Sequence, residues 1–371
     1  MKHHLILIAA LAAMALHAGA QTPEYTGDFR TKVKAFSHLD ISLTSGTTGV
    51  GLDAAMPIGD KFRLRAGFAF MPHISKVLHF GVQVGEKAEG QTEEDFRKVS
   101  QNKFNRLSGL LSSFTGYQVD DKVDMLAIPT YYNFSVLADF YPLPRNKHWR
   151  VTAGIYIGNK QVGKSYNKTE DMPSLLAVGI YNNLYEKALA GEPLTTVGEN
   201  DVYLPDEYAQ KFIEYGKMSI RLGDYAHDIY YTENEYYTED EWEEVDGEWV
   251  AHQKGDLKHA IGDVKYHAGE AYRMVPDENS MAKAWAYVNR LKPYVGLGYE
   301  GRLVKNDDRW HIGFDAGVLF WGGAPKVVTH DGTDLTRDVK NVRGKVGDYV
   351  DVIKKFEVFP VLNLRITRRI F

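Results

Sequence analysis

The stretch Phe62–Phe70, FRLRAGFAF, decides the fold, because apolar residues stand at every even position and arginine, glycine or alanine at every odd one. A period of two places these two sets on opposite faces of a β-strand. The same alternation recurs in VGLDAAM (50–56), NFSVLADF (133–140), WRVTAGIYIG (149–158), YVGLGYEGRL (294–303) and WHIGFDAGVLF (310–320). The chain is therefore predicted to be all-β.

The phase of these stretches predicts eight antiparallel strands, near 36–44, 48–57, 62–72, 131–142, 148–160, 292–303, 310–322 and 357–371. Three connections on one side are short, whereas the other side carries one short turn, SGTT, and insertions at about 73–130, 161–291 and 323–356. Short turns on one side and long loops on the other are typical of outer-membrane barrels. We therefore predict an antiparallel up-and-down transmembrane β-barrel of about eight strands.

Periodicity alone does not say which face points inward, and a soluble barrel with an inward apolar face is the alternative. The polar faces, however, carry small residues and a balanced set of charges. These are the carboxylates Asp40, Asp53, Asp139, Glu300 and Asp315 and the arginines Arg63, Arg65, Arg150, Arg302 and Arg365. A narrow polar interior needs such a balance, and large inward residues such as Tyr156 and Tyr294 would fill it. The prediction is a closed lumen with a charge network, and an apolar face toward lipid.

Residues 1–20 are predicted to be a secretory signal peptide, because a lysine, a twelve-residue apolar core and the small residues AGA follow one another. Cleavage is expected between Ala20 and Gln21. A membrane anchor, the alternative, needs about 20 apolar residues. The barrel is thus expected to occupy residues 21–371 of an exported protein.

Three blocks resemble the strand–turn–strand segments of small bacterial outer-membrane barrels of the eight-stranded OmpA-transmembrane and OmpW-like kind. They are LADFYPLPRNKHWRVTAGIYIGNKQV (137–162), PYVGLGYEGRL with WHIGFDAGVLFWGGAPKV (293–303 and 310–327), and FEVFPVLNLRITRRIF (356–371). The resemblance implies the outer membrane of a Gram-negative bacterium, contact with outer-membrane lipid, recognition by the barrel-assembly machinery and no cofactor. It covers the strands and not the long insertions.

The C-terminal strand departs from the family pattern. Its apolar face holds Leu364, Ile366 and Ile370, whereas the terminal Phe371 stands one position out of phase. Either Ile370 fills the membrane-facing position, or a β-bulge near Arg368 and Arg369 restores the phase. The four apolar residues are the predicted C-terminal assembly signal.

The insertions contain stretches of helical periodicity. Thr92 with Asp95 is typical of a helix start before the apolar positions that run to Phe114, and Pro173 opens a helix that stops near Gly191. Residues 206–218 and 280–290 are predicted to form two further helices. Stripes at this spacing are usually packing faces, so we expect a small helical cap over the barrel mouth.

The segment 230–250, YYTENEYYTEDEWEEVDGEWV, contains two near-copies of one hexapeptide and is rich in acidic and aromatic residues. Its candidate interaction residues are Tyr230, Tyr231, Tyr236, Tyr237, Trp242 and Trp249. Carboxylates suit calcium, and aromatic rings suit sugar faces. The favoured interpretation is a solvated loop tip, because no EF-hand spacing is present.

Signals for catalysis and nucleic-acid binding are weak. The chain has no cysteine, which excludes disulfides and thiolate metal sites, and a formal net charge of −5 with no basic patch, so no nucleic-acid partner is expected. No GxSxG, HExxH or phosphate-binding loop occurs. His73 with Ser75, and His311 with Asp315, are the only candidate catalytic pairs, and no catalytic, cofactor or metal residue is assigned.

Two classes of function remain. The first is a structural or surface-interaction protein that contacts an extracellular protein or glycan through its loops. The alternative is a barrel that binds a small molecule, lipid or glycan, or an outer-membrane lipid-modifying hydrolase or acyltransferase. The first class is preferred, and no enzymatic activity is expected.

Overall fold

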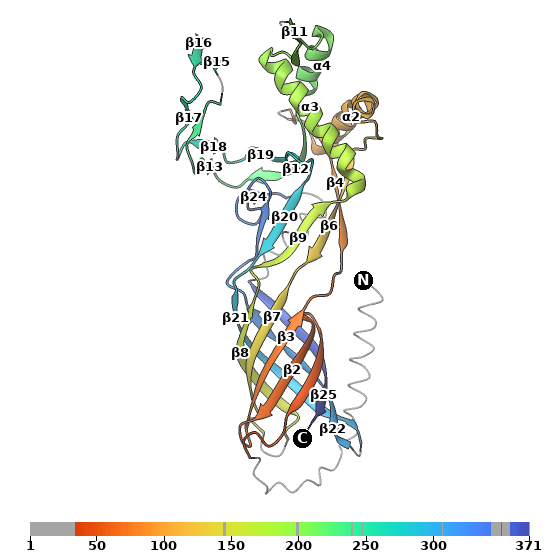
Figure 1. Ribbon diagram of the computed structural model, residues 1–371, viewed down its shortest axis with the longest axis vertical. Helices are drawn as coiled ribbons and strands as arrows, with labels where there is room; N and C mark the ends of the chain where they lie inside the picture. The colour runs from red at the N-terminus through yellow and green to blue at the C-terminus, as the bar shows by residue number, and fades with distance from the viewer. Residues whose placement is uncertain are drawn as a thin grey trace.

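The computed structural model of the chain describes residues 34–88, 90–143, 146–197, 200–238, 240–245, 248–305, 307–342, 350 and 357–370, and of residues 93, 114, 241–245, 248 and 249 only the backbone. The predicted signal peptide with Ala20 and Gln21, and the terminal Phe371, lie outside these residues. Within them, the chain forms a barrel at one end and a taller distal module at the other (Figure 1).

Eight strands form one closed antiparallel barrel, which confirms the predicted fold class. In chain order they are β1 (Asp40–Gly46), β2 (Gly49–Pro57), β3 (Phe62–Phe70), β7 (Tyr132–Phe140), β8 (Trp149–Gly158), β21 (Leu291–Val304), β22 (Asp307–Phe320) and β25 (Val358–Arg369). The last strand pairs with the first, from Asp40 opposite Arg369 to Gly46 opposite Asn363. The closure leaves no free sheet edge.

The barrel is polar inside and apolar outside. Along β7, for example, Asn133, Ser135, Leu137 and Asp139 are buried, whereas the alternate residues from Tyr132 to Ala138 are exposed. This pattern is the reverse of a soluble barrel's, in which the apolar face is buried. It therefore supports the predicted orientation of the two faces.

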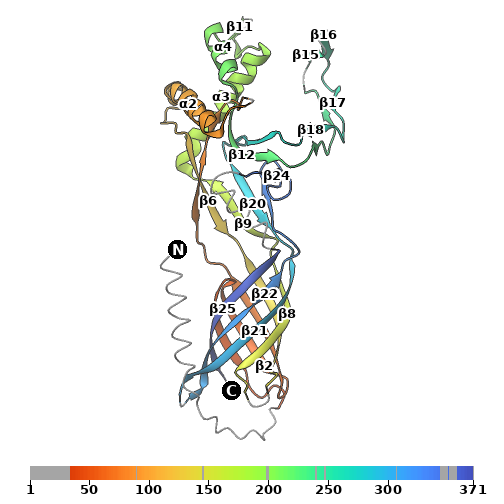
Figure 2. The same ribbon diagram turned by 180° about the vertical axis from the view of Figure 1, so that it is seen from behind.

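The three insertions leave the same end of the barrel and fold together as the distal module, which comprises the described parts of 71–131, 159–290 and 321–342. Directly above the barrel stands a five-stranded antiparallel sheet in the order β23 (Lys326–Thr329), β20 (Lys283–Tyr287), β9 (Gln161–Asn167), β6 (Lys122–Pro129) and β4 (Lys76–Gly81). Strands from all three insertions thus share one sheet (Figure 2).

A second small sheet continues upward, with β12 (Met218–Tyr225) between β19 (Ala271–Met274) and β24 (Val339–Lys340) and also paired with β5 (Gln83–Val84). Near it lie α2 (Glu93–Thr115), α3 (Met172–Ala190) after the 3₁₀ turn η1 (Thr169–Asp171), and α4 (Asp206–Tyr215). One cluster of 22 buried apolar residues joins these helices and strands. The insertions therefore form a module with its own core.

Three of the four predicted helices are present, although α4 ends at Tyr215 and Met218, which was included in its predicted range, begins β12. The Thr92 side chain accepts from the backbone N of Asp95 at the start of α2, and Gly191 ends α3 in the left-handed conformation. The prediction of a helix over 280–290 is wrong, because residues 283–287 form strand β20 between β9 and β23. The cap is also higher than predicted, since the five-stranded sheet separates the helices from the barrel mouth (Figure 1).

A narrow arm, residues 225–272, branches sideways from the second sheet (Figures 1 and 2). It consists of the strand pairs β13 (Ile229–Tyr230) with β18 (Val264–Tyr266), β14 (Glu235–Tyr236) with β17 (Leu257–His259), and β15 (Glu241–Val245) with β16 (Glu248–His252). A short hairpin, β10 (Thr195–Val197) with β11 (Asn200–Val202), lies near α4. No helix within the described ranges is long and apolar enough to span a membrane.

Candidate functional site

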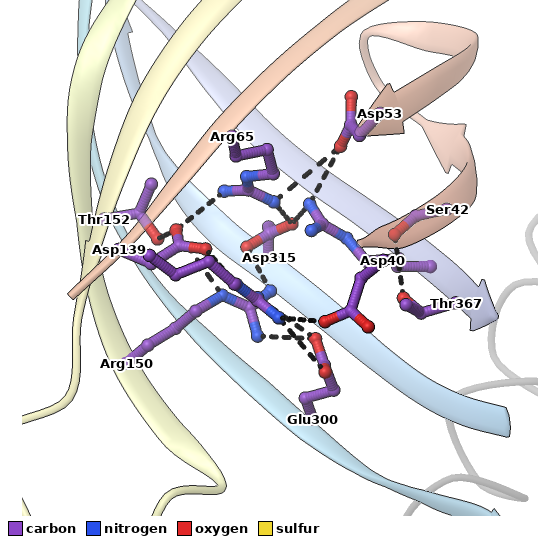
Figure 3. A network of polar contacts seen from close by, with 12 residues as sticks. Asp40, Ser42, Asp53, Arg65, Asp139, Arg150, Thr152, Glu300, Asp315 and Thr367 are labelled. Atoms are coloured by element: carbon purple, nitrogen blue, oxygen red, sulfur yellow. Dashed lines mark hydrogen bonds and ion pairs between the residues drawn. The ribbon is translucent and has the colours of Figure 1, made fainter. Parts of the chain in front are cut away.

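The barrel interior brings together nine of the ten predicted network residues, and each of their side chains is at most 11% exposed. They come from all eight barrel strands and point toward the barrel axis because each stands in the inward phase of its strand (Figure 3). The nine are Asp40, Asp53, Arg63, Arg65, Asp139, Arg150, Glu300, Asp315 and Arg365.

Two aspartates form the centre of this network. Asp139 accepts from Arg63 Nε at 3.0 Å, from Arg65 at 3.1 Å and from the Thr152 hydroxyl at 2.7 Å. Asp315 accepts from Arg65 at 2.9 Å, from Arg150 at 2.7 Å and from Arg365 (Figure 3). Because every carboxylate oxygen here receives a charge-assisted hydrogen bond, the buried charges are compensated.

Glu300 and Asp40 extend the network toward the end of the barrel opposite the distal module. The Glu300 carboxylate accepts hydrogen bonds from both terminal nitrogens of Arg63, at 3.2 and 3.3 Å, and from one terminal nitrogen of Arg150, at 3.3 Å. Asp40 lies 3.7 Å from Arg63 and 3.1 Å from Arg369 Nε.

The prediction that Arg302 belongs to this network is wrong. Arg302 is near the end of β21, is one-third exposed, and pairs with Asp308 at 2.6 Å. The fifth arginine is instead Arg369 on β25, so the balance of five arginines and five carboxylates is kept with a different member. Arg369 shares its inward phase with Arg365 and Thr367, and this phase is the sequence signal by which it could have been found.

A second layer fills the interior between this network and the distal module. It consists of Leu137, Tyr156, Tyr294, Leu319 and Val361, which are all buried. The rings of Tyr156 and Tyr294 meet edge to face at 5.5 Å. At Gly296, a Cβ atom would lie 2.3 Å from the Tyr294 hydroxyl, so glycine makes room for the ring. We call this set the aromatic layer.

Lys292 is buried at the level above the aromatic layer and was not predicted. Its ammonium group donates to Asn133 Oδ1 at 3.1 Å and to the Asn159 carbonyl at 3.4 Å, and it lies 5.4 Å from the centre of the Tyr131 ring. Within the described part of the chain, no carboxylate pairs with it. Sequence reasoning missed Lys292 because it stands at the first inward position of β21, where the alternation begins.

Neither candidate catalytic pair is assembled. Asp315 is occupied by arginines, and His311 Nδ1 has no hydrogen-bond partner among the described residues. His73 and Ser75, both described, are not hydrogen-bonded to each other. No group of three acidic or histidine side chains suited to a metal ion occurs among the residues that the structure describes. The absence of enzymatic activity stays a prediction.

The C-terminal strand resolves the two alternatives for its end. Leu364, Ile366 and Ile370 all lie on the outer face, and the pairing of β25 with β1 and β22 runs to Arg368 and Arg369 without a shift in register. The described residues therefore contain no bulge here, and Ile370 takes the outward position.

The arm is built from three copies of one unit, YAHDIY (225–230), YTENEY (231–236) and YTEDEW (237–242). The first tyrosine of each exchanges two backbone hydrogen bonds of 2.8–2.9 Å with a turn of the returning chain, at Gly269–Glu270, Gly262–Asp263 and Gly255–Asp256 respectively. All three turn glycines have a positive φ of 93–97°. We call each pairing of a tyrosine with its turn a rung of the arm. The three rungs repeat the same geometry.

Side chains repeat in the same way. The fourth residue of each unit accepts a backbone N–H of the returning chain at 2.7–2.8 Å: Asp228 from Ala268, Asn234 from Ile261 and Asp240 from Lys254. The first tyrosine stacks on a ring across the arm, Tyr225 on Tyr266, Tyr231 on His259 and Tyr237 on His252, at 4.4–4.7 Å. The first unit was not predicted, because it shares only two tyrosines and an aspartate with the other two.

The candidate interaction residues of the arm therefore divide into two groups. Tyr231 and Tyr237 hold the rungs together, whereas Tyr230 and Tyr236 are 53% and 50% exposed and stand opposite Val264 and Leu257. The side chains of Trp242 and Trp249 lie outside the described residues, although their backbones pair within β15 and β16.

Comparisons with known proteins give only distant similarities. No family model matches the chain, and no curated protein matches it. Among solved structures, Acinetobacter baumannii CarO2 is 12% identical, with 91% of this chain and 100% of that chain covered and a TM-score of 0.34. A major outer membrane protein from Thermus thermophilus is 11% identical, with 90% and 98% covered and a TM-score of 0.27. The barrel assignment rests on the strand pairing described above.

Proposed function

We propose that this protein is an outer-membrane β-barrel of a Gram-negative bacterium, in which the barrel is a non-conducting anchor and the distal module binds partners at the cell surface. Outer-membrane lipid and the barrel-assembly machinery would be its partners during biogenesis. An extracellular protein or glycan would be its partner in function.

The observation that carries the proposal is the filled interior. An eight-stranded barrel is just wide enough for side chains to fill. Here a compensated network of ten charges and a layer of buried aromatic and aliphatic side chains lie in series along the axis. A hydrated ion would have to break several charge-assisted hydrogen bonds to pass.

The outer face supports insertion into lipid. Large aromatic residues gather at two heights: Phe70 beside Tyr132 near the distal module, and Trp149, Tyr299 and Phe314 toward the other end. The residues between them, such as Val136 and Leu297, are aliphatic and exposed. Transmembrane barrels have this apolar band between two aromatic girdles.

The distal module supports a role in binding. All long insertions leave one end of the barrel, which is the extracellular end in outer-membrane barrels. The arm carries 13 acidic residues against three lysines and repeats an exposed tyrosine beside an aliphatic residue on two rungs. Aromatic residues presented on a rigid scaffold are common binding elements.

Recordings from planar bilayers that contain the purified full-length protein test the anchor. We expect no steady conductance, because the interior is filled. As a matched control, a variant with both Tyr156 and Tyr294 replaced by alanine should still refold and should show more frequent current fluctuations. Stable, uniform channels in the unmodified protein would contradict the proposal.

A further inference from the structure

An apolar groove lies among the helices α2, α3 and α4 of the distal module. These helices lie at the end of the module farthest from the barrel (Figure 1). The groove has a volume of about 430 Å³, within the range of ligand sites. Its eight lining residues come from α2, α3, α4 and the segment that joins the last two, and every one is apolar or aromatic. They include Leu110, Ile180, Leu184, Leu204 and Tyr208.

The groove is not a part of the core that packing has already closed. The inner face of α3 packs against the core, where Leu175, Val178 and Tyr181 are buried. Its opposite face carries Ile180 and Leu184, which are only partly buried and which line the groove together with Leu110 of α2 and residues of α4. A helix that is apolar almost all round is expected to have partners on every side.

The α4 wall is held by a single buried side chain. Phe212 is the one buried residue of this helix, and its ring meets Tyr181 edge to face at 5.2 Å. Tyr208 and Ile213 on the same helix are exposed. Exposed apolar residues that line a concave surface are typical of an interaction site.

The segment 186–214, which supplies five of the eight lining residues and is here called the lip, is acidic. Among the described residues of 186–214, six are carboxylates and two are lysines. Lys187 donates to the carbonyls of Pro193 and Leu194 at 2.8 and 3.1 Å, and Lys211 pairs with Glu207 at 2.6 Å. Glu192 and Asp206, both exposed, have no cationic partner among the residues that the structure describes. On the α2 side, Lys103 donates to the backbone carbonyls of Glu214 and Tyr215, and Arg106 bonds to the Tyr215 side chain.

We infer that this groove binds a cationic amphipathic helix of another polypeptide. The apolar floor fits the apolar face of such a helix, which is recognised through side chains one turn apart. The carboxylates of the lip fit lysine or arginine on its flanks. An anionic lipid or a fatty acid would place a negative group against this lip, which disfavours both as ligands. The inference rests on the proposed display of the distal module outside the membrane.

The test uses the full-length protein in nanodiscs of zwitterionic lipid and a fluorescently labelled synthetic helix of leucine and lysine. A second peptide carries glutamate in place of every lysine. Fluorescence anisotropy, corrected with empty nanodiscs, should show saturable binding of the lysine peptide that weakens with salt. Binding of the glutamate peptide should be at least about tenfold weaker.

Two leucines of α3 provide a matched pair of variants. Leu184→Ser alters the groove and should weaken binding of the lysine peptide about tenfold. Leu189→Ser changes a residue that is 60% exposed and does not line the groove, and should leave binding unchanged. Since Leu184→Ser could also loosen the helices, a double variant of exposed residues, Glu192→Gln with Asp206→Asn, should reduce both affinity and its salt dependence.

Other outcomes would overturn the inference. Equal binding of both peptides would mean an apolar site without charge selection. Binding of laurate that Leu184→Ser abolishes, with no peptide binding, would mean a lipid site. A concentration-dependent dimer in sedimentation that Leu184→Ser disrupts would mean that a second copy occupies the groove. None of these results bears on surface display, which is measured separately by labelling in cells.

Discussion

The barrel and the distal module are built in opposite ways. In the barrel the fully buried large side chains include Arg65 and Arg150, and the exposed ones include Phe, Leu, Ile, Val, Tyr132 and Trp149. In the module 22 apolar residues form a buried core. The difference follows from the solvent: burial of apolar surface stabilises a fold only against water, whereas a fold in lipid must satisfy its polar groups internally. One chain therefore uses two different sources of stability.

Removal of one charge from the barrel interior should have the largest effect. Asp315→Asn leaves Arg65, Arg150 and Arg365 without a shared carboxylate, and breaking a buried pair in this way costs about 3–5 kcal/mol. Urea titration of the protein refolded in lipid vesicles, with heat-dependent migration on gels as the readout of the folded barrel, measures the loss.

Lys292→Met is the control, because it removes a buried charge that no described carboxylate compensates. We expect little loss of stability or a gain. If Asp315→Asn and Lys292→Met were equally tolerated, the carboxylates of the network would not be needed to compensate the buried arginine charges.

A cavity in the module should be nearly as costly but should act on the module alone. Leu175 is fully buried, and replacement of such a leucine by alanine costs about 2–5 kcal/mol. Leu175→Ala should make the module sensitive to limited proteolysis while the barrel keeps its heat-dependent migration. Loss of both transitions together would mean that the two regions fold as one unit.

A charge on the outer face of the barrel should be about as disruptive as it is in other membrane barrels. Phe68→Arg places a cation between Phe70, Tyr132 and Phe134 on the exposed face, at an expected cost of roughly 2–4 kcal/mol. Folding yield in vesicles measures this cost, and Phe68→Leu is the matched control. Equal yields of the arginine and leucine variants would contradict a lipid-facing position.

The smallest expected effect is a dependence of module stability on pH. Burial opposes ionisation of Asp331, but hydrogen bonds from the Thr329 hydroxyl, the Thr333 backbone N–H and the Tyr272 hydroxyl outweigh it and hold the pKa of Asp331 below its ordinary value. Because its pKa is lower in the folded state, ionised Asp331 stabilises the module fully at pH values above the pKa of the unfolded aspartate, about 3.9. This stabilisation is lost as the pH falls through the pKa of the folded state.

Thermal unfolding of the module between pH 6 and pH 3 checks this dependence. Asp331→Asn should remove part of the acid sensitivity and should leave the barrel transition unchanged. The same acid sensitivity in the variant as in the unmodified protein would assign the effect to other carboxylates.

The contrast also explains which parts of the structure could be predicted from the sequence. In a barrel strand every second residue faces lipid, so strands are visible as alternation. The strands predicted near 62–72 and 148–160 are β3 (Phe62–Phe70) and β8 (Trp149–Gly158), shorter by one or two residues at their ends. The inward phase likewise identified nine residues of the network. Arg302 was misassigned because the alternation continues past the point where β21 leaves the barrel interior.

In the module, tertiary contacts determine the secondary structure to a greater extent than in the barrel. Residues 280–290 are rich in alanine and favour a helix locally, yet β9 and β23 pair with β20 on both sides and impose a strand. The joining of three insertions in one core left no local signal, because residues such as Val84, Leu175 and Leu335 come from three different insertions. The first unit of the arm, YAHDIY (225–230), was hidden for a similar reason, since its geometry repeats although most of its residues do not.

The most direct test of the central account uses the absence of cysteine from the chain, which gives a clean background for single cysteines. Tyr236→Cys on the arm, Lys61→Cys in the β2–β3 turn and Val136→Cys on the outer face are treated in cells with a membrane-impermeant maleimide. We predict labelling of Tyr236→Cys in intact cells, of Lys61→Cys only after the outer membrane is permeabilised, and of Val136→Cys only after unfolding. Labelling of Val136→Cys in the folded protein, together with recovery of all three variants in a soluble fraction, would contradict a membrane anchor that displays the distal module at the surface.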